Sequence, residues 1–167
     1  MELTPFYHFE KNVKIRAADS LQFMITGHVD LIRIPPPSKS PSKIEGLYNT
    51  TCFEVFAMSP TGQYIEWNFS PSLDWCVFSF EKYRKKTTDL AGIETFSKLR
   101  FSKSSEEIVL SVELEIDLVK RLLNTDKLKV SCTAVIEFTT GKIEYYAFSH
   151  PSDKPDFHDP KGFLIEW

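Results

Sequence analysis

The sequence predicts an all-β domain, an antiparallel β-sandwich of two sheets with one short helix. Apolar residues recur mostly with a period of two, which is the spacing that places side chains on one face of a strand. Tight turns, such as residues 59–62 and 140–142, separate the alternating segments and favour antiparallel neighbours. Aromatic residues make up 14% of the chain, including 14 Phe, and rings are enriched in strands.

The alternating segments give the expected order of elements. A long strand with one wet face is expected at residues 21–31, before a proline-rich surface loop at 33–41. Further strands are expected at residues 52–58, 64–70, 75–83, 99–102, 108–116, 128–138, 143–150 and 163–167. A helix of about two turns is expected at 117–123, where an Asp precedes three Leu on a shared side. We therefore expect about nine strands in a single domain that spans residues 1–167.

Composition and charge narrow the class of partner. The formal net charge of −3 argues against binding to nucleic acid or to an anionic membrane, and the basic run at 82–86 is interpreted as a solvated strand end. The first thirty residues lack the apolar run of a signal peptide, and no later stretch has the length of a membrane span. Cys52, Cys76 and Cys132 lie too far apart in the sequence for a zinc or thiol redox motif. We expect a cytoplasmic protein with reduced thiols, and the oligomeric state is not predicted.

Three segments, residues 47–56, 64–84 and 146–163, carry a resemblance to a known family. The first has Tyr48 followed six positions later by Glu54 on an expected strand. The second begins YIEWNFSPS, and the third begins YAFSHP and continues through KPDFHDP. Together these segments resemble the DOMON-like proteins related to family 9 carbohydrate-binding modules, and the resemblance spans most of the chain.

The resemblance implies a two-sheet sandwich of jelly-roll or immunoglobulin-like architecture that binds a carbohydrate or another small ligand without catalysis. The side chains suit this chemistry, because a pyranose packs its C–H groups on aromatic rings and its hydroxyls against carboxylates, amides and imidazoles. The ligand-binding residues that follow from the resemblance and from these side chains are Tyr48, Glu54, Tyr64, Glu66, Asn68, Tyr146, His150, Asp156 and His158.

Strand parity leaves two interpretations for each of the acids Glu66 and Glu54. Tyr64, Glu66 and Asn68 share one face of their strand, which forms either a binding face or an ordinary solvent-exposed one. Glu54 shares parity with apolar residues, so its carboxylate is either a ligand contact or half of a structural ion pair with a neighbouring Arg or Lys. The sugar-binding relatives place an arginine near the strand at 64–70, and this sequence has none at positions 65 or 66.

The third segment also has the residue types of a metal site, His150, Asp156, His158 and Asp159. Two bracketing prolines, Pro155 and Pro160, favour instead a structured loop whose Asp side chains cap backbone amides. We therefore expect no cofactor, with a structural calcium ion held by this loop as the alternative.

Other functional classes are less well supported by the sequence. Glu54 and Glu66 have the residue types of a glycosidase pair, but no serine or cysteine lies in a nucleophile motif and extra loops that would build a deep cleft are not evident. Haem binding, known for some DOMON relatives, needs axial ligands on opposite sides of the iron, and Met24 and His28 share one strand face. We expect a protein that is not an enzyme, with an interaction or scaffold domain as the alternative to a ligand-binding module.

Overall fold

The computed structural model describes residues 1–10, 12–17, 21–87 and 95–167. Within these residues, strands pair side by side in one continuous antiparallel path. In spatial order the path is β7 (Lys85–Thr87), β6 (Trp75–Lys82), β5 (Tyr64–Phe69), β4 (Cys52–Met58), β10 (Lys129–Glu137), β11 (Ile143–Ala147), β1 (Glu2–Pro5), β2 (Val13–Ala17), β3 (Gln22–Gly27), β9 (Glu107–Leu114) and β8 (Phe96–Lys103). A short strand, β12 (Ile165–Glu166), pairs with the start of β10. The only α-helix of the described residues is α1 (Ile116–Leu122).

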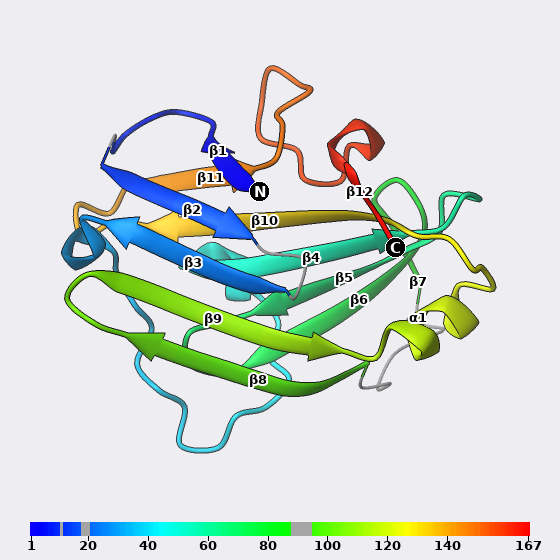
Figure 1. The fold of residues 1–167 in the computed structure, drawn as a ribbon, viewed down its shortest axis with the longest axis horizontal. Coiled ribbons are helices and arrows are strands. Elements are labelled where there is room, and N and C mark those ends of the chain that lie inside the picture. Colours follow the sequence, from blue (N-terminus) through cyan, green and yellow to red (C-terminus); the bar gives the residue numbers. More distant parts are fainter. Residues whose placement is uncertain (11, 18–20, 88–94) are drawn as a thin grey trace.

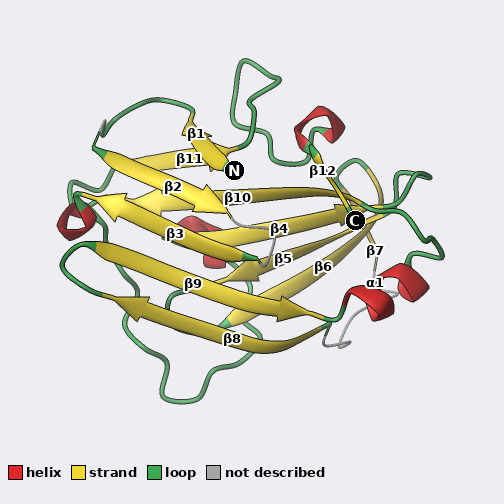
Figure 2. Ribbon diagram, in the orientation of Figure 1, coloured by secondary structure: helices red, strands yellow, loops and turns green. Residues whose placement is uncertain are grey.

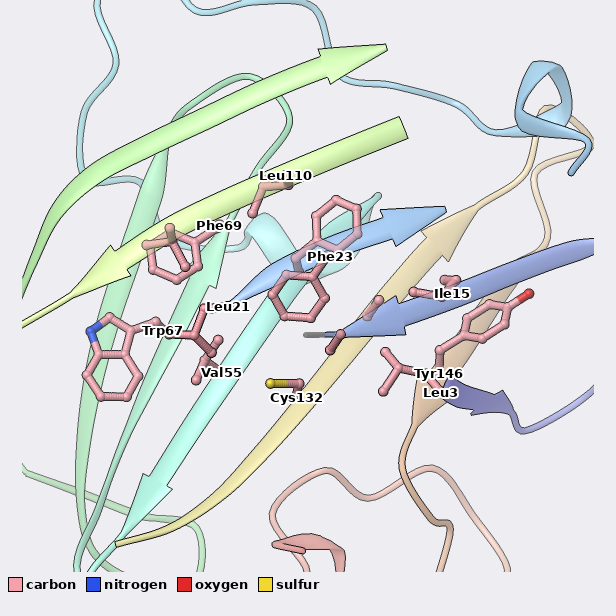
Figure 3. Packing of buried hydrophobic residues seen from close by; sticks show 14 of the residues in the cluster. Leu3, Ile15, Leu21, Phe23, Val55, Trp67, Phe69, Leu110, Cys132 and Tyr146 are labelled. Atoms are coloured by element: carbon pink, nitrogen blue, oxygen red, sulfur yellow. The ribbon is translucent and has the colours of Figure 1, made fainter. Parts of the chain in front are cut away.

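The path forms two layers because β1 pairs with β11 on one side and with β2 on the other. The layer of β2, β3, β9 and β8 therefore lies over the layer of β10, β4, β5 and β6, as Figures 1 and 2 show. The main core fills the space between the layers, with Trp67 and Val55 from one layer packed against Phe23 and Leu110 from the other (Figure 3). The all-β antiparallel fold with one short helix is confirmed.

Most of the expected strands form close to their predicted bounds, and the exceptions have local causes. The single strand expected at 21–31 is wrong, because Gly27 has a φ of +103° and ends β3, and Val29–Leu31 then forms a 3-10 turn. His28 therefore lies outside the strand and is exposed, and it shares no strand face with Met24. The short strands β1, β2 and β7 were not predicted.

The face of β6, β5, β4, β10 and β11 that points away from the main core is also covered. A second apolar cluster forms there from Phe56, Tyr64, Phe80 and Phe163, so the chain after β11 packs against this face. The loop that precedes β4 is held by an ion pair between the Arg33 guanidinium and the Glu137 carboxylate, 3.1 Å apart. Every residue of β5 is buried, so the interpretation of residues 64–68 as a solvent-exposed face is wrong.

None of the helices within the described residues is long and apolar enough to cross a membrane.

Candidate functional site

A cavity of about 550 Å³ opens on this covered outer face of the sheet. Its volume lies within the range typical of small-molecule sites. It is lined by Tyr7, Tyr48, Asn49, Glu54, Glu66, Phe78, Phe80, Arg84, Lys86, Val135, Ile143, Tyr145, Pro155, Phe157 and His158. Six of these fifteen are Phe or Tyr and five are ionisable acids, bases or imidazole, so the cavity combines rings with charged groups. The expectation that the chain lacks loops to build a cleft is wrong, because segments around residues 48 and 157 wall this cavity.

Strand register explains why the charged residues of the floor converge. Glu54 of β4 lies opposite Asn68 of β5, and Glu66 lies opposite Phe56. Residues directly opposite in a sheet point to the same face, so both carboxylates and the amide share the outer face. Lys86 of β7 lies opposite Phe80 of β6 and joins them on this face.

Glu54 is buried at 4% exposure, and the structure gives it few partners. Its Oε2 accepts a hydrogen bond of 3.1 Å from the Thr133 hydroxyl. No Lys or Arg of the described residues forms an ion pair with it, so a structural ion pair is not what holds this carboxyl there. Burial raises the pKa of Glu54 well above its usual value, and repulsion from Glu66 raises it further. Both effects favour the neutral, protonated form of this carboxyl, which can donate its proton in a hydrogen bond.

Glu66 lies in a different environment. Its Oε1 accepts a 2.6 Å hydrogen bond from the Asn68 amide, and Asn68 in turn accepts from the Cys52 thiol at 3.7 Å. Burial raises the pKa of Glu66, but the Asn68 amide and the positive charges of Lys86 and Arg84 oppose the rise. Of the two carboxyls, Glu66 is the one whose surroundings better tolerate a negative charge.

A chain of hydrogen bonds fixes the His158 ring beside Glu66. The backbone N–H of Arg84 donates to the Tyr64 hydroxyl at 3.0 Å, and the same hydroxyl is hydrogen-bonded to His158 Nδ1 at 2.8 Å. The other ring nitrogen of His158, Nε2, lies 3.8 Å from Glu66 Oε2. Burial lowers the pKa of His158 to about 4, with the charge of Arg84 adding to the effect, so the ring is a neutral donor at pH 7.

Arg84 and Lys86 are site residues that the sequence reasoning missed. Both belong to the basic run at 82–86, which was interpreted as a solvated strand end, yet both line the cavity. Arg84 has a φ of +55°, a conformation that disfavours side chains, and its guanidinium pairs with Asp156 at 2.8 Å. The Lys86 ammonium lies 3.5 Å from the centre of the Phe78 ring. The hairpin between β6 and β7 therefore supplies the cations that are absent from β5.

Aromatic side chains form the rim. Gly46, with a φ of +84°, turns the chain into the 3-10 turn Leu47–Asn49, which carries Tyr48. Tyr48 is 47% exposed and lies at the mouth of the cavity. Tyr145 of β11 and Phe157 of the last loop contact each other edge to face, with ring centres 6.0 Å apart. A ligand in the cavity would therefore meet rings at its sides and ionisable groups at its floor.

The residues predicted from the sequence separate into three groups. Four of them line the cavity: Tyr48, Glu54, Glu66 and His158. Three others lie behind the cavity and orient the residues that line it: Tyr64, Asn68 and Asp156.

The remaining two predicted residues lie elsewhere. Tyr146 lies in the main core beside Leu3, as Figure 3 shows, because it is opposite Ala134 on the inner face of the sheet. Its neighbour Tyr145 lines the cavity in its place. His150 is directed to the backbone of β1, with its Nε2 2.8 Å from the Thr4 carbonyl oxygen.

The loop at residues 151–160 forms the capped structure favoured by its prolines. Asp156 accepts from the backbone of His158 at 3.1 Å, and Asp159 accepts from the backbone of Lys161 at 2.9 Å. Burial disfavours the charge of Asp156, but hydrogen bonds from Tyr83 and Arg84 outweigh this and lower its pKa. Across the described part of the chain, no three His, Cys, Asp or Glu side chains are grouped so that they could hold a metal ion.

Comparison with models of protein families, with curated proteins and with solved structures finds no match for this chain. The resemblance to DOMON-like proteins therefore stays a prediction from its three sequence segments, and the function is argued from the cavity.

Replacing Glu54 by Gln is expected to remove a pH-dependent loss of stability. The folded protein keeps Glu54 protonated while the unfolded chain ionises near pH 4.5, so the free energy of unfolding of the parent falls as the pH rises from 4.5 towards the folded pKa. Relative to the parent, the Glu54→Gln variant should become more stable over this interval. Urea unfolding at several pH values measures this, and the contribution of His158 cancels in the comparison.

Glu113→Gln is a matched control for this measurement. Glu113 is half exposed and bonded to Lys98, which lowers its pKa, so its replacement should not produce a gain of stability with rising pH. A difference between Glu54→Gln and the parent that stays constant with pH would contradict a protonated Glu54.

Proposed function

We propose that the cavity binds a carbohydrate and that the protein acts as a binding module. The observation that carries this proposal is the pair of buried carboxyls on the floor, whose surroundings favour the protonated, donating form of Glu54 and better tolerate the charged, accepting form of Glu66. A sugar hydroxyl is both a donor and an acceptor, so two neighbouring groups of opposite role satisfy it more completely than two carboxylates would.

The rings of the rim support the same ligand class. A pyranose presents a patch of C–H groups on one side, and Tyr48, Tyr145 and Phe157 offer apolar surface beside the polar floor. The charges of the site also balance. Lys86 opposes the charge of Glu66, and Arg84 pairs with Asp156. Burial favours the neutral form of Glu54, and His158, with a pKa of about 4, is neutral at pH 7, so the site favours an uncharged ligand over an anion or a cation.

The test is a glycan array followed by calorimetry on the sugars that bind. Tyr48→Ala is expected to weaken binding about 10-fold, since a ring contact with a ligand is worth about 1.4 kcal/mol. Tyr48 is 47% exposed, so the variant should keep the stability of the parent. Leu164→Ala serves as the control, because Leu164 is 50% exposed and does not line the cavity.

Two results would count against the proposal. If no sugar on the array binds, and Tyr48→Ala and Glu54→Gln alter only stability, the chain is better described as an interaction or scaffold domain. Equal weakening by Tyr48→Ala and Leu164→Ala would mean that the sugar lies outside the cavity.

A second candidate function is glycoside hydrolysis, and the observation that favours it is the unequal protonation of Glu54 and Glu66. A neutral acid beside a carboxylate is the arrangement that general acid catalysis needs. In that case Glu54 would donate its proton to the leaving oxygen, and Glu66 would take a proton from the attacking water, whose hydroxyl joins the sugar; proton exchange with solvent then restores both carboxyls. Turnover of aryl glycosides by the parent, lost in Glu54→Gln, would support this candidate over a binding module, and the absence of turnover with sugars that bind would exclude it.

A further inference from the structure

Two aromatic rings lie in the open beside the cavity. Tyr7 is 48% exposed and Phe9 is 44% exposed, and their rings stack with centres 5.1 Å apart and planes 22° apart. Two exposed rings next to one another leave a sizeable apolar surface in water, which marks a binding surface more often than chance does.

A buried carboxylate holds these rings in place. Glu144 is fully buried, and it accepts hydrogen bonds from the backbone N–H groups of Tyr7 at 2.7 Å, Phe9 at 2.9 Å and Tyr145 at 3.1 Å. Burying a carboxylate is costly unless several donors satisfy it. Two of the three donors, Tyr7 and Phe9, carry the exposed rings, so the ring surface is fixed before any ligand arrives and little ordering is needed on binding.

The ring surface continues the cavity. Tyr7 lines the cavity and contacts Tyr145, another lining residue, edge to face at 6.3 Å. Phe9 lies beyond Tyr7 and is not part of the lining. The Lys142 ammonium is 4.9 Å from the centre of the Phe9 ring, so a hydrogen-bond donor stands next to the exposed ring.

We propose that Tyr7, Phe9 and Lys142 form a second carbohydrate subsite, which binds the next sugar unit of an oligosaccharide whose end occupies the cavity. This inference rests on the proposed function and names the ligand class as an oligosaccharide. The subsite repeats the chemistry of the cavity, because the rings take the C–H face of a sugar and the ammonium donates to its hydroxyls.

The test compares ligand length in the full chain by calorimetry. The probes are glucose, galactose, mannose, xylose and N-acetylglucosamine, each as a monosaccharide, a disaccharide and a tetrasaccharide. In the parent, a tetrasaccharide should bind about 10-fold more tightly than its monosaccharide, which corresponds to the gain from one added ring contact. Phe9→Ala should remove this gain and leave the affinity for the monosaccharide unchanged. Tyr48→Ala is the matched variant, since it should weaken all lengths alike.

A readout on the parent protein avoids dependence on any variant. The ring resonances of Phe9 should shift in NMR spectra when the tetrasaccharide is added and stay in place with the monosaccharide. The inference is overturned if affinity does not depend on length, or if Phe9→Ala weakens the short and long sugars equally. If the inference fails in this way but Tyr48→Ala still weakens monosaccharide binding, the proposed function stands. If no sugar of any length binds, both the proposed function and the second subsite are wrong.

Discussion

Replacing Glu66 by Gln is expected to weaken sugar binding about 10- to 100-fold while it makes the fold more stable. The carboxylate is the charged acceptor of the cavity floor, and a hydrogen bond to a charged group contributes about 1.5–3 kcal/mol. Gln has nearly the same shape and can still accept from Asn68, so the loss comes from the charge.

The gain in stability has a separate cause. Glu66 is 6% exposed, and it lies beside Glu54, so the folded protein holds two coupled acids away from water. Removing the ionisable group relieves the cost of holding the Glu66 carboxylate away from water. Loss of function together with a gain of stability is the signature of a residue retained for its function.

Calorimetry and urea unfolding of Glu66→Gln at pH 7 test both parts. Glu81→Gln is the control, because it changes the net charge equally from a position on β6 that is half exposed and outside the cavity. It should alter neither binding nor stability by more than about 0.5 kcal/mol. Retained binding with lowered stability in Glu66→Gln would identify Glu66 as a structural residue and contradict the proposed site.

Period-two alternation was sufficient to predict much of the fold. Glu54 was placed correctly on β4 among apolar neighbours, and Tyr64, Glu66 and Asn68 on one face of β5, because parity depends only on local sequence. That the outer face is covered did not follow, since the covering segments contact it across long sequence separations, as Phe163 does with Phe56. Alternation cannot tell a wet face from one that lies under a distant loop.

The site was predicted less completely than the fold, for two different reasons. Tyr146 was misplaced although a signal was present, because the hairpin register puts it opposite Ala134, which alternates with the core residue Cys132. Arg84 and Lys86 gave no comparable signal. Their position depends on a tight turn inside a run of charged residues and on the register that sets Lys86 opposite Phe80.

Replacing Gly27 by Ala is expected to lower the free energy of unfolding by at least about 3 kcal/mol. Gly27 has a φ of +103°, and a Cβ there would lie 1.6 Å from the backbone oxygen of Asn12. That oxygen accepts a 3.1 Å hydrogen bond from the backbone of His28 at the point where β3 ends. The added carbon must therefore displace the backbone of the strand pair, because no flexible side chain is available to move.

Gly62→Ala separates this steric effect from backbone strain. Gly62 also has a positive φ, of +88°, but a Cβ there would meet no atom within 4 Å. It should cost only about 1–2 kcal/mol, which is the strain of the left-handed conformation alone. Urea unfolding of both variants gives the difference directly, and equal costs would mean that the strand pair at Gly27 yields easily. A larger cost at Gly27 would explain why β3 ends there, four residues earlier than alternation predicts, and why Val29 turns into the core.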